Sequence, residues 1–190
     1  MDLLAVYRTV KDSDNTSYLL SSGLQIVRVN TGWTKFALEN GGGQMLERWG
    51  RNSALLDAVP PVLRDLYRTG FAKALATGVC WEHDYECSSH ELFREFRMYA
   101  YPIHGTLLTV THSLRVQRPH DREARPAADA IYRSEGLIRM CSYCRRVRAN
   151  DADERWDWVP SFVEHMPPGV SHGICRPCAA FHQLATPAAP

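Results

Sequence analysis

The sequence predicts an α+β protein in which an antiparallel sheet has its helices packed on one side, followed by a small cysteine-rich module at the C-terminus. Two observations lead to this prediction. Short strands and helices precede a run of three strand-like segments within residues 1–117, and this order is typical of α+β folds. Four of the six cysteines then form two C-x-x-C pairs after residue 130.

The first segment predicts an amphipathic helix over residues 2–10, with Asp2 as its N-cap. Leu3, Tyr7 and Val10 form an apolar stripe on this helix, and little chain precedes the helix to cover it. We therefore expect a homodimer formed through this helix and a neighbouring sheet face. The alternative is that the stripe folds back onto its own sheet.

Residues 18–30, YLLSSGLQIVRVN, predict two short strands around a Ser-Ser-Gly turn. Residues 31–40 then predict a short helix that Thr31 caps and that the glycines at 41–43 end. A longer helix is expected over residues 61–77. Its apolar stripe indicates core packing and consists of Val62, Leu63, Leu66, Tyr67, Phe71 and Leu75.

Three strands follow, over residues 79–87, 94–103 and 105–116. Residues on one face of a strand recur at every second position, so each strand has a predictable set of inward side chains. The first strand places Val79, Trp81, His83, Tyr85 and Cys87 on one face. The last strand places Leu108, Val110, His112, Leu114 and Val116 on one face.

Residues 118–129 are polar and contain Pro119 and Pro126, so they predict a linker that no continuous helix can cross. The predicted domains are therefore 1–117, including the N-terminal helix, and a second unit over 130–184. Residues 185–190 predict a flexible tail. Because two units joined in this way can move independently or dock, we expect docking through Trp156, Trp158 and Phe162.

The bulk composition narrows the function classes. The chain has 190 residues and a net charge of +1, so its overall charge does not attract it to nucleic acid or to anionic lipid. The N-terminus lacks the pattern of a signal peptide, and no apolar run is long enough to cross a bilayer. We expect a cytoplasmic protein without membrane contact, whose cysteines stay reduced.

The two C-x-x-C pairs predict one tetrahedral zinc site with the ligands Cys141, Cys144, Cys175 and Cys178. His172 could replace one cysteine or donate a hydrogen bond to a sulfur, or it could be a turn residue that does not touch the metal. Four thiolates leave no open coordination position, so the predicted role of zinc is structural. A helix beginning at Pro160 should bury Val159, Phe162, Val163 and Met166, together with Trp156 and Trp158, against the metal loops.

Three arginines, Arg145, Arg146 and Arg148, lie beside the first C-x-x-C pair. They could contact phosphate groups of a nucleic acid. The favoured interpretation is a solvated face that offsets the thiolate charge, because no basic run continues beyond them.

Two stretches, GLQIVRVNTGWTKFALENGG and YECSSHELFREFRMYAYPIHGTLLTVTHS, resemble the opening and the closing strands of PAS domains. The resemblance covers residues 15–117. It implies a five-stranded antiparallel sheet above a cavity that is used for sensing or for protein contacts. The implied cavity residues, for which core packing is the alternative, are Trp33, Phe36, Tyr85, Phe96 and His112. The sequence does not identify a ligand.

Residues 136–182 resemble a cysteine-rich module attached to bacterial sensor kinases and response regulators. The resemblance rests on the two cysteine pairs, Arg145, Arg146, Trp156 and the Ser-His-Gly that begins at Ser171. In that module a proline often follows the first cysteine of the second pair directly. Here Arg176 occupies that position, and the proline, Pro177, comes one residue later.

The sequence shows no kinase or phospho-receiver motif and no catalytic set. We therefore expect a non-enzymatic signalling protein of bacterial type whose output is a contact with a protein partner. Two alternatives stay open. One is a nucleic-acid-binding regulator that uses the arginines, which is disfavoured, and the other is a thiol-redox sensor that releases zinc on oxidation.

Overall fold

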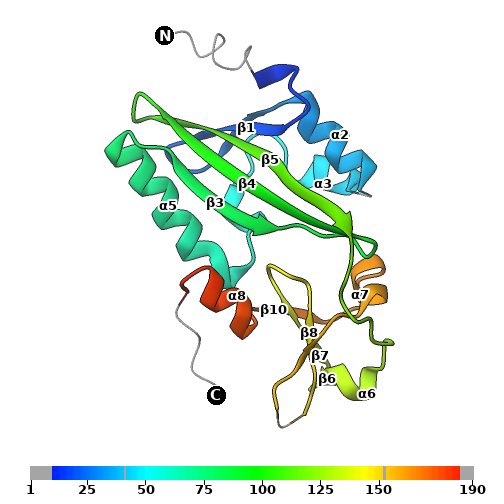
Figure 1. Ribbon diagram of the computed structural model, residues 1–190. Coiled ribbons are helices and arrows are strands. Elements are labelled where there is room, and N and C mark those ends of the chain that lie inside the picture. Colours follow the sequence, from blue (N-terminus) through cyan, green and yellow to red (C-terminus); the bar gives the residue numbers. More distant parts are fainter. Residues whose placement is uncertain (1–9, 41, 152, 185–190) are drawn as a thin grey trace. The chain divides into compact units, whose positions relative to one another are not determined.

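The computed structural model describes residues 10–40, 42–151 and 153–184 (Figure 1). The chain divides into two compact units. The first comprises the chain up to Tyr85 together with Phe96–Arg115, and the second comprises Glu86–Glu95 together with the chain from Val116 onward. The tip of one hairpin therefore belongs to the C-terminal unit. Compact units are not the same as independently folding domains, so the domain limits drawn from the sequence stay a prediction.

The first unit is built on a five-stranded sheet of order β2-β1-β5-β4-β3 (Figure 1). β1 and β2 are antiparallel, as are β1 and β5, and short turns join β3, β4 and β5. The strands are β1 (Thr16–Ser21), β2 (Ile26–Val29), β3 (Trp81–Glu86), β4 (Leu92–Ile103) and β5 (Leu107–Pro119). The predicted α+β class and its antiparallel five-stranded sheet are confirmed.

The helices of the first unit are α2 (Thr31–Glu39), α3 (Gly43–Arg48), α4 (Leu55–Ala58) and α5 (Arg64–Thr77), with a 3-10 turn, η1 (Pro61–Leu63), before α5. The predicted helix over 61–77 is therefore η1 and α5. It ends at Gly78, whose φ of 72° is the left-handed conformation that glycine adopts without strain.

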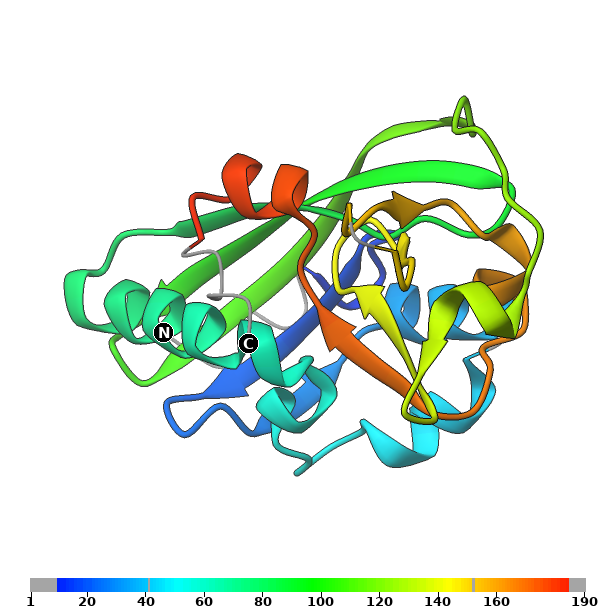
Figure 2. The same cartoon turned by 90° about the horizontal axis from the view of Figure 1, so that it is seen from below.

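α5 lies along one face of the sheet (Figures 1 and 2) and contributes Phe71 and Ala74 to the core. A Cβ atom at Gly70 would lie 2.3 Å from the Trp81 ring, so the absence of a side chain lets α5 approach β3. None of the described helices has the length and apolar character that crossing a bilayer requires.

The start of α2 differs from the prediction, because its N-cap is Asn30 rather than Thr31. The Asn30 Oδ1 atom accepts hydrogen bonds from the backbone N–H groups of Trp33 and Ser17, each at 2.9 Å. Its Nδ2 atom donates to the carbonyl oxygens of Val10, Ser13 and Asn15 at 2.8–3.1 Å. A side-chain amide has two N–H donors besides its acceptor oxygen, whereas a hydroxyl has a single O–H donor and cannot satisfy this many backbone groups. Thr31 instead donates to the Lys11 carbonyl.

The predicted apolar face of β5 is only half correct. Leu108 and Val110 are fully buried, but Leu114 and Val116 are 46% and 38% exposed. The register explains the change, because β1 pairs with β5 only as far as His112. Beyond that point the strand has left the core of the first unit.

The predicted N-terminal helix lies almost wholly outside the described residues. Leu3 and Tyr7 belong to the undescribed part, so the homodimer surface assigned to them stays a prediction.

The second unit contains a small sheet of order β10-β7-β8-β9, and β6 also pairs with β7. Its strands are β6 (Arg133–Ser134), β7 (Leu137–Cys141), β8 (Val147–Arg148), β9 (Trp156–Asp157) and β10 (Val170–Gly173). Its helices are α6 (Asp129–Tyr132), α7 (Pro160–Glu164) and α8 (Arg176–Phe181). Sequence analysis did not predict this sheet, because strands of two to five residues are too short to show a period.

A second core fills this unit and consists of Tyr132, Ile138, Met140, Val147, Ala149, Val159 and Phe162. The predicted helix at Pro160 is confirmed as α7. Met166 is exposed, contrary to the prediction, because α7 ends at Glu164. Trp158 is buried as expected, whereas Trp156 is only partly buried.

The segment predicted as a linker makes specific contacts within the second unit. β5 continues to Pro119, and His120 donates its backbone N–H to the Glu91 carbonyl at 3.2 Å. Arg125 donates its backbone N–H to the Trp158 carbonyl at 2.8 Å, beside a parallel bridge between Ala124 and Trp158. These bonds hold residues 119–125 in place despite their polar composition.

Asn30→Ala is expected to lower the free energy of unfolding by about 2–4 kcal/mol, because it removes the helix cap and leaves several backbone groups without partners. Urea denaturation followed by circular dichroism measures this change. Asn30→Asp is the matched control. It keeps the acceptor but presents a carboxylate to three carbonyl oxygens, so it should destabilise at least as much. A loss below about 1 kcal/mol for both variants would contradict the role assigned to Asn30.

Candidate metal centre

Four cysteines gather in the second unit at the ends of two strands. Cys141 is the last residue of β7, and Cys144 lies in the turn that joins β7 to β8. The turn closes because Arg145 adopts a φ of 60° and Cys141 donates its backbone N–H to the Arg146 carbonyl at 2.8 Å. Cys175 is the N-cap residue of α8, and Cys178 lies within that helix.

The pairing of β7 with β10 brings the two cysteine pairs together. These strands are parallel, and the register places Gly173 opposite Cys141. Ser142 donates its backbone N–H to the Gly173 carbonyl at 2.8 Å, which continues the ladder into the loops that carry the cysteines. Cys141 and Cys175 are 34 positions apart in the sequence, and the register of this ladder brings them together.

The four Sγ atoms all lie within 4.8 Å of one another, and those of Cys144 and Cys175 are 3.6 Å apart. Ligands at ~2.3 Å from a tetrahedral metal ion are separated by about 3.8 Å, so this spacing fits one ion. Cys141, Cys144 and Cys175 are buried, and Cys178 is partly exposed. The four cysteines can therefore bind a metal ion.

The thiols strongly influence one another. Hydrogen bonds from the neighbouring thiols, that of Cys144 first, lower the pKa of Cys141. The reciprocal hydrogen bond to Cys141 raises the pKa of Cys144. The pKa of Cys175 is also lowered and that of Cys178 is also raised, so not all four thiolates form together, because several negative sulfurs repel one another at this distance. A cation at the centre removes that repulsion and allows all four to ionise.

Arg122 lies beside this group and is the main functional residue that sequence analysis missed. Its guanidinium forms a two-pronged ion pair with Glu86, with N···O distances of 2.6 and 2.9 Å, and also donates to the Cys144 carbonyl at 2.9 Å. The two side chains are only 11% and 13% exposed. The rings of Phe93 and Trp158 lie 5.5 and 5.1 Å from its central carbon.

The pKa of Arg122 reflects these contacts. Burial alone would lower it, but the hydrogen bonds and charge of Glu86, followed by the charges of Cys144 and Cys178, raise it overall. Arg122 therefore stays charged and joins the β3–β4 hairpin, which carries Glu86 and Phe93, to the loop that carries Cys144. The sequence offered no periodic signal for this pair, because Arg122 falls in an irregular polar segment.

The five residues assigned to a PAS-like cavity lie together in the first unit. Tyr18, which was not predicted, completes a continuous series of ring contacts with centroid separations of 5.2–5.9 Å. The series runs Trp33, Tyr18, His112, Tyr85, Phe96, Phe36. These rings pack against one another, as the core-packing alternative expects, and their assignment to a ligand stays a prediction.

His112 lies at the centre of that series between two tyrosine hydroxyls. The Tyr85 Oη atom is 2.7 Å from Nδ1, and the Tyr18 Oη atom is 3.2 Å from Nε2. Burial, and then the charge of His83, lowers the pKa of His112 to about 4. The imidazole is therefore neutral near pH 7 and can accept one hydrogen bond while donating the other.

The other predicted site residues lie around the cysteines without joining them. His172 is exposed on β10 and is not one of the four residues whose ligand atoms converge. Arg145, Arg146 and Arg148 are partly exposed, and Arg148 forms an ion pair with Glu154.

Comparison with known proteins gives fold-level likeness only. No protein-family model matches this sequence, and no curated protein matches it either. Among solved structures, a domain of an HTR-like protein from Haloarcula marismortui is 12% identical, with a TM-score of 0.39, and covers 55% of this chain and 100% of its own.

Two further similar structures are PAS domains. That of a Colwellia psychrerythraea protein is 12% identical, with a TM-score of 0.41, and covers 58% of this chain and 95% of its own. The PAS domain of nitrogen regulation protein NR(II) from Vibrio parahaemolyticus is 13% identical, with a TM-score of 0.29. The match covers 60% of this chain and 98% of that domain.

Arg122→Met is expected to lower the free energy of unfolding by about 3–5 kcal/mol, because it keeps an apolar side chain between the two rings but leaves the Glu86 carboxylate buried and unpaired. The measurement is urea denaturation of the metal-loaded protein. Adding Glu86→Gln should restore part of the loss. Arg118→Met is the control, since Arg118 also lies over Phe93 but pairs with Asp121 at the surface, and it should cost less than about 1 kcal/mol. Equal costs for the two arginines would contradict the role assigned to Arg122.

Proposed function

We propose that this chain is a non-enzymatic signalling protein in which a PAS-like sensing or protein-interaction unit is combined with a structural zinc module. The observation that carries the proposal is the convergence of four mostly buried cysteine sulfurs within 4.8 Å. The five-stranded antiparallel sheet supports the other half, because it is the sheet that the PAS resemblance of residues 15–117 implies.

Cys141, Cys144, Cys175 and Cys178 would hold the ion. Zinc suits an all-thiolate tetrahedral set, and its binding supplies about 10–16 kcal/mol of apparent free energy to small modules of this kind. The second core contains only seven buried side chains, so a metal is a reasonable source of its stability. Arg122 would contribute a positive charge next to the anionic zinc–thiolate group.

The non-enzymatic assignment rests on the lack of a catalytic motif in the sequence, and the closed ligand set argues against catalysis at the metal. Four thiolates occupy every position of a tetrahedral ion, which leaves none for a reactive water or a substrate. The output would then be a contact with a protein partner, made by a cytoplasmic homodimer that uses the N-terminal helix.

A redox role is the second candidate, and the exposure of Cys178 favours it. This sulfur is partly accessible, whereas the other three are buried. An oxidant such as hydrogen peroxide would reach Cys178 first, convert its thiolate to a sulfenic acid with release of hydroxide, and so remove one ligand from the ion.

Purified protein is expected to contain one zinc ion per chain, as measured by elemental analysis and native mass spectrometry. The double variant Cys175→Ser and Cys178→Ser should lose the ion, because only two thiolate ligands remain. The matched control is Cys80→Ser with Cys87→Ser. These two free cysteines are not among the four whose sulfurs converge, so the control should retain the ion.

Zinc-free wild-type protein, or an unchanged zinc content after loss of Cys175 and Cys178, would overturn the zinc assignment. For the redox candidate, reversible zinc release by peroxide would support it, and retention of zinc after peroxide treatment would exclude it.

A further inference from the structure

A row of polar side chains crosses the outer face of the small sheet in the second unit. The register places Met140 opposite Val147 in the antiparallel pair β7–β8, so the preceding residue of β7, Arg139, faces the following residue of β8, Arg148. Ser171 of β10 is the neighbour of Arg139, and Trp156 of β9 is the neighbour of Arg148. Met140 and Val147 point into the core, and the row lies on the opposite face.

Two arginines directly opposite each other on one face of a sheet repel, so this arrangement needs a compensating anion. Arg148 forms an ion pair with one oxygen of Glu154, and the other oxygen of Glu154 lies 3.5 Å from Arg176. Within the described residues, no carboxylate lies at ion-pair distance from Arg139. Arg148 and Arg176 therefore share one carboxylate, and Arg139 lacks one in the described part of the chain.

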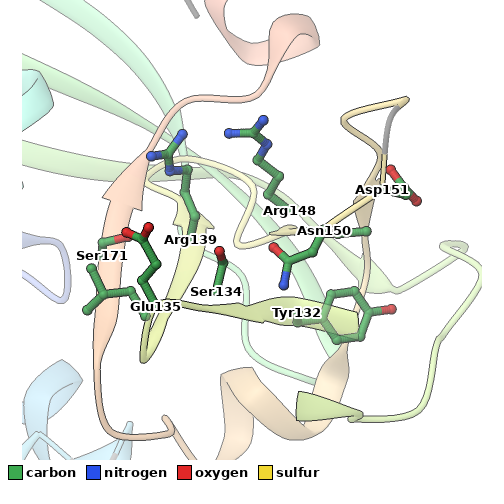
Figure 3. Close-up of a pocket in the computed structure, with 10 residues that line it drawn as sticks. Tyr132, Ser134, Glu135, Arg139, Arg148, Asn150, Asp151 and Ser171 are labelled. Atoms are coloured by element: carbon green, nitrogen blue, oxygen red, sulfur yellow. The ribbon is translucent and has the colours of Figure 1, made fainter. Parts of the chain in front are cut away.

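A cavity of about 360 Å³ opens over this row. That volume lies at the lower end of the range for sites that bind small molecules. Figure 3 shows the guanidinium groups of Arg139 and Arg148 extending to the same side of the sheet. Hydroxyl and amide donors line the same cavity and come from Ser134, Ser171 and Asn150.

Two carboxylates, those of Asp151 and Glu135, also line the cavity and bear on its net charge. Asp151 is 3.2 Å from the Arg155 guanidinium and accepts a hydrogen bond from the Arg155 backbone, so its charge is already compensated. Glu135 stands on the exposed turn between β6 and β7 and lines the cavity. Glu135 should weaken the binding of any anion.

We propose that this cavity binds a phosphate group, either as the free ion or as part of a small phosphorylated molecule. Arginine presents its N–H donors in a planar fork that matches two oxygens of a phosphate, and two such forks extend to the same side of the sheet here. The hydroxyl and amide donors can bind the remaining oxygens. Bound phosphate would supply the negative partner that Arg139 lacks and would reduce its repulsion with Arg148.

The test is isothermal titration calorimetry of the metal-loaded full chain at fixed ionic strength. The probes are inorganic phosphate, adenosine monophosphate and adenosine, the last being the control without a phosphate. Phosphate or the monophosphate should bind, and adenosine should not. Tighter binding of the monophosphate identifies a phosphorylated molecule as the ligand, and equal or weaker binding identifies the free ion.

Arg139→Gln should weaken binding at least tenfold, because it removes one fork from each bound phosphate. Glu135→Gln should tighten binding about two- to fivefold, because it removes a repulsive charge. Arg68→Gln, on the exposed side of α5 in the first unit, should leave binding unchanged. An unchanged zinc content and circular dichroism spectrum would show that each variant is folded.

Three results would overturn the proposal. The first is no binding of either phosphate probe at millimolar concentration. The second is equal affinity in wild type and Arg139→Gln. The third is binding to a single-stranded oligonucleotide without binding to either small probe, since that would assign the arginines to a macromolecular surface.

Discussion

The buried ion pair between Arg122 and Glu86 is the contact on which the arrangement of the second unit depends. A charge removed from water is expensive unless its partner is present and well oriented, so the two residues fix each other's positions. Glu86 ends β3, and the same guanidinium also donates to the carbonyl of Cys144. One side chain thereby ties the tip of a long hairpin to the loop of a candidate metal ligand.

This contact joins the loop of Cys144 to the tip of the β3–β4 hairpin within the second unit. The turn that carries Cys144 is closed by backbone hydrogen bonds, and a cation among the four sulfurs would stabilise it further by removing their mutual repulsion. If these cysteines hold an ion, we expect its removal to loosen the hydrogen bond between Arg122 and the Cys144 carbonyl, and with it the restraint on Glu86.

Local patterns made the fold class and the four cysteines predictable, because strand alternation, proline at a helix start and C-x-x-C spacing each act over a few residues. The cap of α2 was misassigned, since choosing Asn30 over Thr31 requires knowing which carbonyls surround it. The ion pair of Arg122 was missed for a related reason: its partner lies 36 residues away and is chosen by tertiary structure. Leu114 was wrongly expected to be buried, because alternation predicts a face but not where its cover ends.

Hydrogen–deuterium exchange of the full chain, metal-loaded and after chelation, tests most directly whether the metal site organises the β3–β4 hairpin. The amides that the structure shows bonded in the hairpin tip, those of Cys87 and Ser89, should be protected with the metal bound and exchange at least tenfold faster after its removal, because Arg122 no longer holds Glu86. Equal protection of these amides in the two states, with the cysteine loops exchanging faster, would contradict the account.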